Sequence, residues 1–291
     1  MAKTRLDIAR EDIVALFDSL PTSVLKHSEI SRLMKDNRQF WRLAKSTTCP
    51  KFIEFLVRRG RMHAVRLEFP SRPEVRYIWG NAALNEVLLS LRPESFFSHY
   101  TAMALHELTD QIPKSVYVNA EQGRKIARET SLEQGRIAAA FARAPRISKN
   151  TCLYEERRIY LLNGKHTGNL GVIDSVGPDG ETIRITDTER TLIDITVRPM
   201  YSGGVAQVLE AFRFAQARVS VNKLLGMLKK IDYVYPYHQA IGFYMDRAGG
   251  FRDSQIALLA EIDKTHDFYL TYQMKDVDYS EKWRLFFPKG F

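Results

Sequence analysis

A chain of 291 residues with 45% apolar and 26% charged residues has the composition of an ordinary folded protein, which excludes global disorder, and its length suggests two domains. Lysine and arginine outnumber aspartate and glutamate by 43 to 34, and the net charge of +9 favours an anionic partner. Nucleic acid is the commonest such partner, while an acidic protein or membrane surface stays open.

The remaining composition excludes several classes of protein. Cys49 and Cys152 belong to no Cys-x-x-Cys pair and no zinc-type cluster, so we expect reduced thiols. The histidines form no metal-binding motif, and no phosphate-binding or dinucleotide-binding loop is present, so we expect neither metal nor cofactor. The polar N-terminus has no apolar signal core, and no apolar run is long enough to span a membrane. These features indicate a cytoplasmic protein without membrane contact.

The first part of the chain predicts helices followed by a small hairpin. Ser28 is a favourable N-cap, Pro50 suits the first turn of a helix, and Gly60 suits a helix end. After Gly60 the apolar spacing changes from helical to alternating. The segments with these patterns are helices over 8–20, 28–37 and 48–59, one or two helical turns over 39–45, and strands over 61–69 and 76–80. This order predicts a winged helix-turn-helix domain over residues 1–80.

Residues 81–291 predict a larger mixed α+β domain, which makes the whole chain α+β. The sequence GPDG at 177–180 joins two strands as a hairpin. Helices are expected over 81–91, 98–108, 131–143, 188–197, 205–217, 221–231, 235–245 and 254–262, and strands over 115–120, 157–162, 170–176, 181–186, 267–273 and 283–288. The domain boundary is expected near residues 80–95.

Basic residues gather on the predicted helix 48–59 and the adjoining hairpin. In a helix-turn-helix, the second helix enters the major groove of DNA with its N-terminal residues near the base edges. The candidate DNA-binding residues are Arg42, Lys45, Thr47, Thr48, Lys51, Arg58, Arg59, Arg61, Arg66, Arg72 and Arg76. We therefore expect binding to duplex DNA, with phosphate contacts that give affinity without sequence information. A winged helix used for protein contacts and a merely solvated basic face are the alternatives.

Two stretches of the second domain, together with the leading winged helix, resemble the AbiE-type antitoxins of type IV toxin–antitoxin systems. The stretches are 98–118 and 185–212, and the resemblance covers roughly residues 10–215. The matching positions are Ser98, Ala102, Leu105, His106, Asp187, Glu189, Arg190, Thr191, Leu192, Asp194, Gly203 and Gly204. His106-Glu107-Leu108 departs from the His-Gly-Leu-like form expected, and the tail from about residue 220 exceeds the family's minimum.

The resemblance implies an autorepressor that binds its own promoter, often at inverted repeats. It also implies a nucleotidyltransferase-like toxin encoded nearby, which the antitoxin neutralises without a stable complex. The expected function is thus transcription regulation of a toxin–antitoxin or antiviral-defence locus, without enzymatic activity.

The segment ITDTERTLID has a structural interpretation of its own. A strand leads into a helix that Asp187 or Thr188 caps, and Glu189 suits the first turn. Arg190 and Asp194 are four residues apart and are expected to pair across one turn at the surface. Gly203-Gly204 is expected to be a turn, since it lacks the lysine and hydroxyl residue of a phosphate-binding loop.

The alternative function is an enzyme that acts on DNA in phage defence, such as a glycosylase that releases a modified base. Its candidate catalytic residues are Asp187, Glu189, Asp194 and His99. Tyr235, Tyr237 and His238 would stack on a flipped base, although the same residues suit core and rim positions. No nucleophile–base motif supports this alternative.

Overall fold

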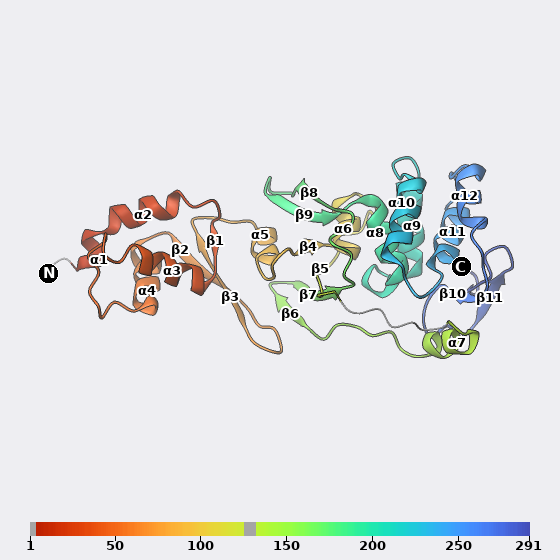
Figure 1. Cartoon of the computed structure of the whole chain (residues 1–291), viewed down its shortest axis with the longest axis horizontal. Helices are drawn as coiled ribbons and strands as arrows, with labels where there is room; N and C mark the ends of the chain where they lie inside the picture. Colours follow the sequence, from red (N-terminus) through yellow and green to blue (C-terminus); the bar gives the residue numbers. More distant parts are fainter. Residues whose placement is uncertain (1–3, 125–131) are drawn as a thin grey trace. The chain divides into compact units, whose positions relative to one another are not determined.

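The computed structural model describes residues 4–124 and 132–291, and the chain has a mixed α+β architecture (Figure 1). The expected α+β class is therefore confirmed. Two compact units divide the chain: the first runs to Leu91 and includes residues 178–181, and the second comprises 92–177 and 182–291. Cys49 and Cys152 are both reduced and buried.

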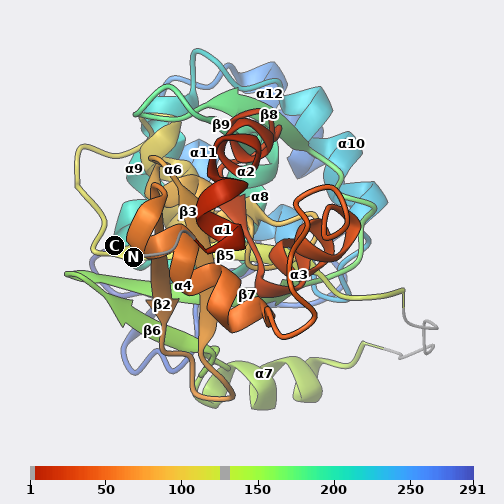
Figure 2. The same ribbon diagram turned by 90° about the vertical axis from the view of Figure 1, so that its left-hand side faces the viewer.

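The first unit combines a group of helices with a small antiparallel sheet. Its helices are α1 (Arg5–Ile8), α2 (Arg10–Asp18), α3 (His27–Asp36), α4 (Cys49–Arg59) and α5 (Leu84–Leu89), and its strands are β1 (Val24–Leu25), β2 (Met62–Leu67) and β3 (Glu74–Trp79). The strand order is β1-β3-β2. Helix α4 packs against α3 and β2, and Figure 2 shows these elements from the side of α1. Phe17, Phe52 and Trp79 join helices and sheet in one core.

The boundaries of α3 and α4 follow from their end residues. Helix α3 begins before Ser28, the expected cap, because the Glu29 carboxylate accepts a hydrogen bond from the Lys26 N–H at 2.7 Å. Helix α4 starts after Thr48, with Pro50 in its first turn. It ends at Gly60, where a Cβ atom would lie 2.5 Å from the Leu56 carbonyl oxygen.

Residues 39–45 form turns rather than a regular helix, and Arg38 holds this segment in place. Its guanidinium donates to the carbonyl oxygens of Ala44 and Thr47, both at 2.6 Å. Trp41 from the same segment is buried against Phe52 of α4. The connection between α3 and α4 is therefore a packed, hydrogen-bonded loop.

The second unit contains a six-stranded mixed sheet in the order β6-β7-β5-β4-β9-β8. Its strands are β4 (Phe96–Phe97), β5 (Ser115–Glu121), β6 (Thr151–Tyr154), β7 (Arg157–Gly164), β8 (Val172–Val176) and β9 (Thr182–Thr186). The β4–β9 and β5–β7 pairs are parallel, and the remaining pairs are antiparallel. Strands β8 and β9 form the expected hairpin.

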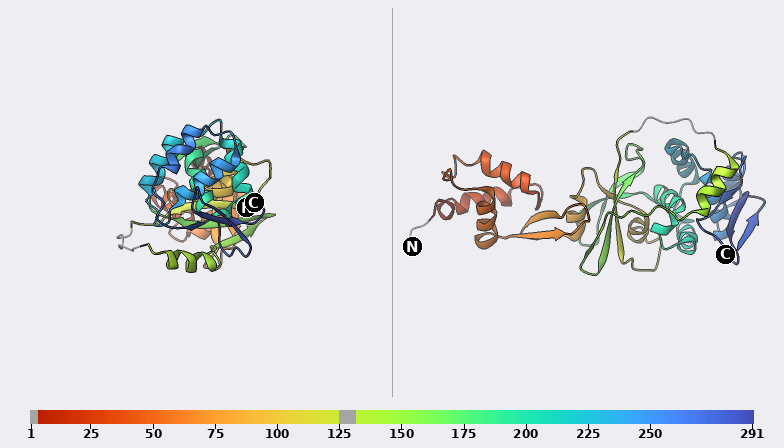
Figure 3. Two further views of the ribbon diagram at one scale, coloured as in Figure 1. Left: turned by 90° about the vertical axis from the view of Figure 1, so that its right-hand side faces the viewer. Right: turned by 90° about the horizontal axis from the view of Figure 1, so that it is seen from below.

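Helices and a second small sheet complete this unit. The helices are α6 (His99–Leu105), α7 (Gln134–Ala142), α8 (Thr188–Val197), α9 (Val205–Ala215), α10 (Val221–Ile231), α11 (Tyr237–Ala248) and α12 (Asp253–Ala260), with a 3-10 turn over Pro199–Tyr201. Strands β10 (Phe268–Tyr269), β11 (Val277–Ser280) and β12 (Leu285–Pro288) form a sheet in the order β10-β12-β11. Helix α7 packs against β10 (Figure 3). Residue 131, where helix was also expected, lies outside the described residues.

Helix α8 is the centre of the second unit. It packs against α6, α9, α10, α11 and β9. Every residue from Glu189 to Val197 is buried, including the charged ones. Because α8 is buried, its polar side chains lie in the interior of the second unit. They therefore need hydrogen-bond or ion-pair partners within the protein.

Within the described ranges, no helix combines the length and apolarity that a membrane crossing requires.

Candidate functional site

Helix α4 presents an exposed polar face in the first unit. Thr48, Lys51 and Arg58 are exposed there, at spacings that place them on one side of the helix. Arg58 pairs with Glu54 at 2.8 Å, and both side chains remain open to solvent. An exposed pair of this type is weak and gives way readily to a phosphate.

Further candidate residues flank the helix. Arg42, Lys45 and Arg59 are exposed, and Thr47 is half-buried. Arg42 has a φ of +49°, in the left-handed region, and its carbonyl oxygen accepts a hydrogen bond from Arg5. The loop before α4 and the two ends of the helix therefore all carry accessible cations.

The hairpin of β2 and β3 adds arginines that have acidic neighbours. Arg66 pairs with Glu68, and Arg72 lies 3.3 Å from Glu74. Arg61, just before β2, pairs with Asp18 of α2 and lies over the Trp79 ring. The three guanidinium groups are mostly exposed, so each can contact an external anion, but Arg61 is also a tie between α2 and the sheet.

Arg76 does not join this surface, and its assignment as a DNA contact is corrected. It is 3% exposed. Its guanidinium donates to the side chain of Glu74, the hydroxyl and carbonyl of Ser90 and the carbonyl of Leu91. Strand alternation turns this residue inward, toward Ser90 and Leu91, which follow α5. Arg76 therefore connects the segment after α5 to strand β3 through hydrogen bonds.

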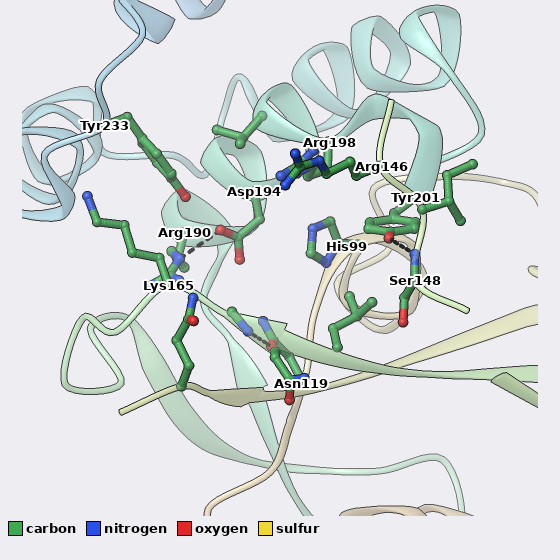
Figure 4. Close-up of a pocket in the computed structure, with 16 residues that line it drawn as sticks. His99, Asn119, Arg146, Ser148, Lys165, Arg190, Asp194, Arg198, Tyr201 and Tyr233 are labelled. Carbon is green, nitrogen blue, oxygen red and sulfur yellow. Dashed lines mark hydrogen bonds and ion pairs between the residues drawn. The ribbon is translucent and has the colours of Figure 1, made fainter. Parts of the chain in front are cut away.

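The second unit contains a cavity of about 430 Å³ (Figure 4). Helix α8, the start of α6, the ends of β5 and β7, and the segment before β6 contribute its walls. Its lining residues are His99, Asn119, Gln122, Arg146, Ile147, Ser148, Leu162, Asn163, Gly164, Lys165, Arg190, Asp194, Val197, Arg198, Tyr201 and Tyr233. Four of these carry a positive charge and one, Asp194, is a carboxylate.

Arg190 and Asp194 form a buried pair, which corrects the expectation of a surface pair. Their side chains are 3% and 5% exposed, and Arg190 Nε lies 2.9 Å from Asp194 Oδ1. Arg190 also donates to the Leu170 carbonyl at 2.7 Å and the Thr167 hydroxyl at 3.1 Å. Burial lowers the pKa of Arg190, but attraction to Asp194 and other groups outweighs it, so the pKa is raised.

Asp187 and Glu189 form a different structure on the other side of the helix start. Lys223 of α10 binds both carboxylates, at 2.9 Å and 2.8 Å. Asp187 also accepts from the Arg190 N–H as the N-cap of α8, as expected. Glu189 accepts from the Ser220 N–H at the start of α10. Neither lines the cavity, so the four candidate catalytic residues do not form one site.

His99 does share the cavity with Asp194. Its Nδ1 atom lies 2.8 Å from the Ser98 hydroxyl, and its ring meets the Tyr201 ring edge-on at 5.4 Å between centroids. Burial, together with the Arg198 and Arg190 charges, lowers the pKa of His99 to about 4 against the opposing effect of Asp194. The ring is therefore neutral at pH 7. Its φ of +53° is unusual for a residue with a side chain.

The rings of Tyr235 and Tyr237 pack against other aromatic side chains, which corrects their base-stacking assignment. The Tyr235 ring contacts Phe141 and Phe268, and Tyr237 is buried against Phe268. His238 is largely buried, and burial lowers its pKa. Because neighbouring rings already pack against Tyr235 and Tyr237, these two side chains are poorly placed to stack on a base.

Arg146, Arg198 and Tyr233 were not predicted as site residues. They lie in connections: before β6, after α8 and after α10. No spacing rule relates such positions, and only the closed fold brings them to one cavity. Among the described residues, no three His, Cys, Asp or Glu side chains are grouped closely enough to hold a metal ion.

Comparison with protein-family models finds no match, and no curated protein matches the chain significantly. Among solved structures, the chain is similar to the crystal structure of the RV2827C protein from Mycobacterium tuberculosis. The two share 13% sequence identity with a TM-score of 0.58, and the similarity covers 96% of this chain and 90% of that chain. This likeness concerns the fold, and it extends over both units.

Proposed function

We propose that the first unit is a winged helix that binds duplex DNA, with α4 as the helix that enters the major groove. The observation that carries the proposal is the order of elements: a helix, a short strand, two helices and a two-stranded hairpin, α2-β1-α3-α4-β2-β3. In this order α4 is the second helix of the helix-turn-helix and the hairpin is the wing. The exposed Thr48, Lys51 and Arg58 on α4 support the same assignment.

We further propose that the chain is an AbiE-type antitoxin-like regulator that represses its own promoter. The support is the order of a DNA reader followed by a larger α+β unit. The motif residues also have structural roles. Asp187 caps α8, and Arg190 and Asp194 form a buried ion pair. A nucleotidyltransferase-like toxin encoded nearby remains the proposed partner in function.

The enzyme alternative has less support from the geometry. A glycosylase needs a carboxylate beside the reacting sugar and a pocket for the flipped base. Asp187 and Glu189 are bound to Lys223, and the rings of Tyr235 and Tyr237 pack against Phe268. Incubation with unmodified and phage-modified DNA, followed by an assay for abasic sites, tests this alternative directly. Base release that disappears in Asp194→Asn, with DNA binding retained, would favour the enzyme.

The test of DNA binding is fluorescence anisotropy with duplex DNA from upstream of the chain's own gene. The double variant Lys51→Gln with Arg58→Gln should weaken binding at all sequences and reduce the salt slope by about one unit for each lost phosphate contact. Thr48→Ala should instead change the sequence preference. A control of equal charge change, Arg10→Gln with Arg213→Gln, should bind as the unmodified protein does.

Two results would contradict the proposal. One is equal weakening in the control and in the α4 variant, which would indicate a diffuse charge effect. The other is full repression of a promoter–reporter fusion by the α4 variant in cells, which would separate α4 from regulation.

A further inference from the structure

The cavity of the second unit contains two arginines that no carboxylate neutralises. Arg190 is bound to Asp194, and Lys165 donates to the Asp232 carbonyl oxygen. Arg146 and Arg198 make no side-chain hydrogen bond or ion pair with any described residue. Arg198 is half-buried, so its charge has lost part of its water without gaining a partner. Arg146 is exposed, and together the two guanidinium groups without a carboxylate partner suit an anion with several oxygen acceptors, of which phosphate is the commonest.

The rest of the lining differs from that of a simple anion site. Ile147, Leu162, Val197 and Tyr233 supply apolar surface beside the arginines. Asp194 lines the same cavity, is almost wholly buried, and its Oδ2 has no hydrogen-bond partner among the described residues. Figure 4 shows the Asp194 carboxylate between Arg190 and the His99 ring, with Arg198 and Tyr233 around it. A ligand with an N–H or O–H donor would satisfy the free oxygen.

We propose that this cavity binds a nucleoside phosphate. The phosphate contacts Arg146 and Arg198, the base or sugar packs against the apolar wall with Tyr233, and a donor group meets Asp194. The volume of about 430 Å³ lies within the range of small-molecule sites, roughly 300–1,000 Å³. The neutral His99 ring gives a wall of the cavity without adding charge. This site shares no residue with the proposed DNA-binding helix, so each proposal can fail without affecting the other.

Isothermal titration calorimetry on the full chain, without DNA, tests the proposal. The ligands are AMP, GMP, CMP and UMP, the four corresponding nucleosides, and inorganic phosphate. We expect one-to-one binding of at least one nucleotide, with its nucleoside and inorganic phosphate each weaker by about tenfold or more. Arg198→Gln and Arg146→Gln should each weaken nucleotide binding by about tenfold, the loss of a charged hydrogen bond. Arg143→Gln, an exposed neighbour outside the cavity, should leave it unchanged.

Each contrary result overturns the proposal. If no nucleotide binds at concentrations up to about 1 mM, the cavity has no such ligand. If inorganic phosphate binds as tightly as the nucleotide, the site recognises a simple anion only. If Arg198→Gln and Arg146→Gln bind nucleotide normally, binding occurs elsewhere. If they lose affinity for duplex DNA while nucleotide binding is absent, the arginines belong to a nucleic-acid contact. Circular dichroism of each variant verifies that it folds.

Discussion

Arg190 joins three parts of the second unit through a single guanidinium. It binds Asp194 on its own helix, the Leu170 carbonyl and the Thr167 hydroxyl in the loop before β8, and it lies 3.9 Å from Glu121 at the end of β5. Glu121 is itself held by the Thr167 N–H and hydroxyl. Removal of one partner from such a buried network leaves an uncompensated charge in the interior.

We therefore expect Asp194→Ala to lower the free energy of unfolding by about 3–5 kcal/mol. Urea denaturation, monitored by circular dichroism, measures this change. The matched control is Glu210→Ala, which breaks an exposed pair with Arg213 and should cost under about 1 kcal/mol. Equal, small losses for the two variants would show that water reaches Asp194.

His99 should make the second unit sensitive to acid. The pKa is about 4 in the folded chain and about 6.5 in an unfolded one, because burial disfavours the charged ring. The unfolded state thus binds more protons between these values, so stability is complete above pH 6.5 and declines as pH falls toward 4. The loss amounts to roughly 3 kcal/mol.

Denaturation midpoints at intervals from pH 7.5 to pH 4 measure the effect. His99→Gln, which cannot gain a proton, should flatten the profile over this window. A decline that persists in His99→Gln would assign the acid sensitivity to other groups.

Residue types and spacing predicted which side chains interact but not how deep they lie. The spacing of Arg190 and Asp194 predicted their pairing correctly. Burial depends on α6, α9, α10 and α11, which pack against the helix, and α6 comes from a distant part of the chain. For the same reason Arg76 was placed at the surface, since its partners Ser90 and Leu91 follow a helix that no local pattern relates to β3.

At the scale of elements, the junction of α8 and α10 depends on one lysine. Lys223 bridges Asp187 and Glu189, and its own side chain is half exposed. Burial raises the pKa of Glu189, but the Lys223 and Ser220 hydrogen bonds outweigh it, so the pKa is lowered. The stability from Glu189 is therefore present above its unfolded pKa and is lost as pH falls through the folded value.

We expect Lys223→Met to destabilise the chain by roughly 2 kcal/mol at pH 7, a value reduced for the exposure of the lysine. The difference between variant and unmodified chain should shrink at low pH, as Glu189 gains a proton. Lys230→Met, an exposed lysine at the end of the same helix, is the control. Thermal unfolding at pH 7 and pH 3.5 gives both values, and a pH-independent difference would argue against the bridge.

The long helices could be predicted from the sequence, whereas the shortest strands could not. The helices α4, α8, α9 and α10 carry clear apolar spacing and end residues, and they lie where they were expected. Strands β1 and β4 have two residues each, too few for alternation to be visible. They exist because β3, β5 and β9 supply hydrogen-bond partners. Their formation is thus a property of the closed sheet.

For the whole molecule, the end of the first unit at Leu91 has a measurable consequence. A fragment of residues 1–80 lacks Ser90 and Leu91, so Arg76 would lose acceptors while its strand stays folded. A fragment of residues 1–91 keeps them. We expect the longer fragment to melt higher by roughly 10 °C, since each kcal/mol shifts the midpoint of so small a domain by about 4–8 °C. Differential scanning calorimetry measures both, and equal midpoints would show that α5 is dispensable.

Residues 178–181, the tip of the β8–β9 hairpin, belong to the first unit although they follow much of the second in sequence. Asn85 donates to Glu181 in this tip at 2.6 Å. During synthesis at about 5–20 residues per second, several seconds therefore pass between emergence of Leu91 and emergence of Glu181. The nascent first unit spends that interval without its last segment. We therefore expect the hydrogen bond between Asn85 and Glu181 to form only after the hairpin has been synthesised, later than the other contacts of the first unit.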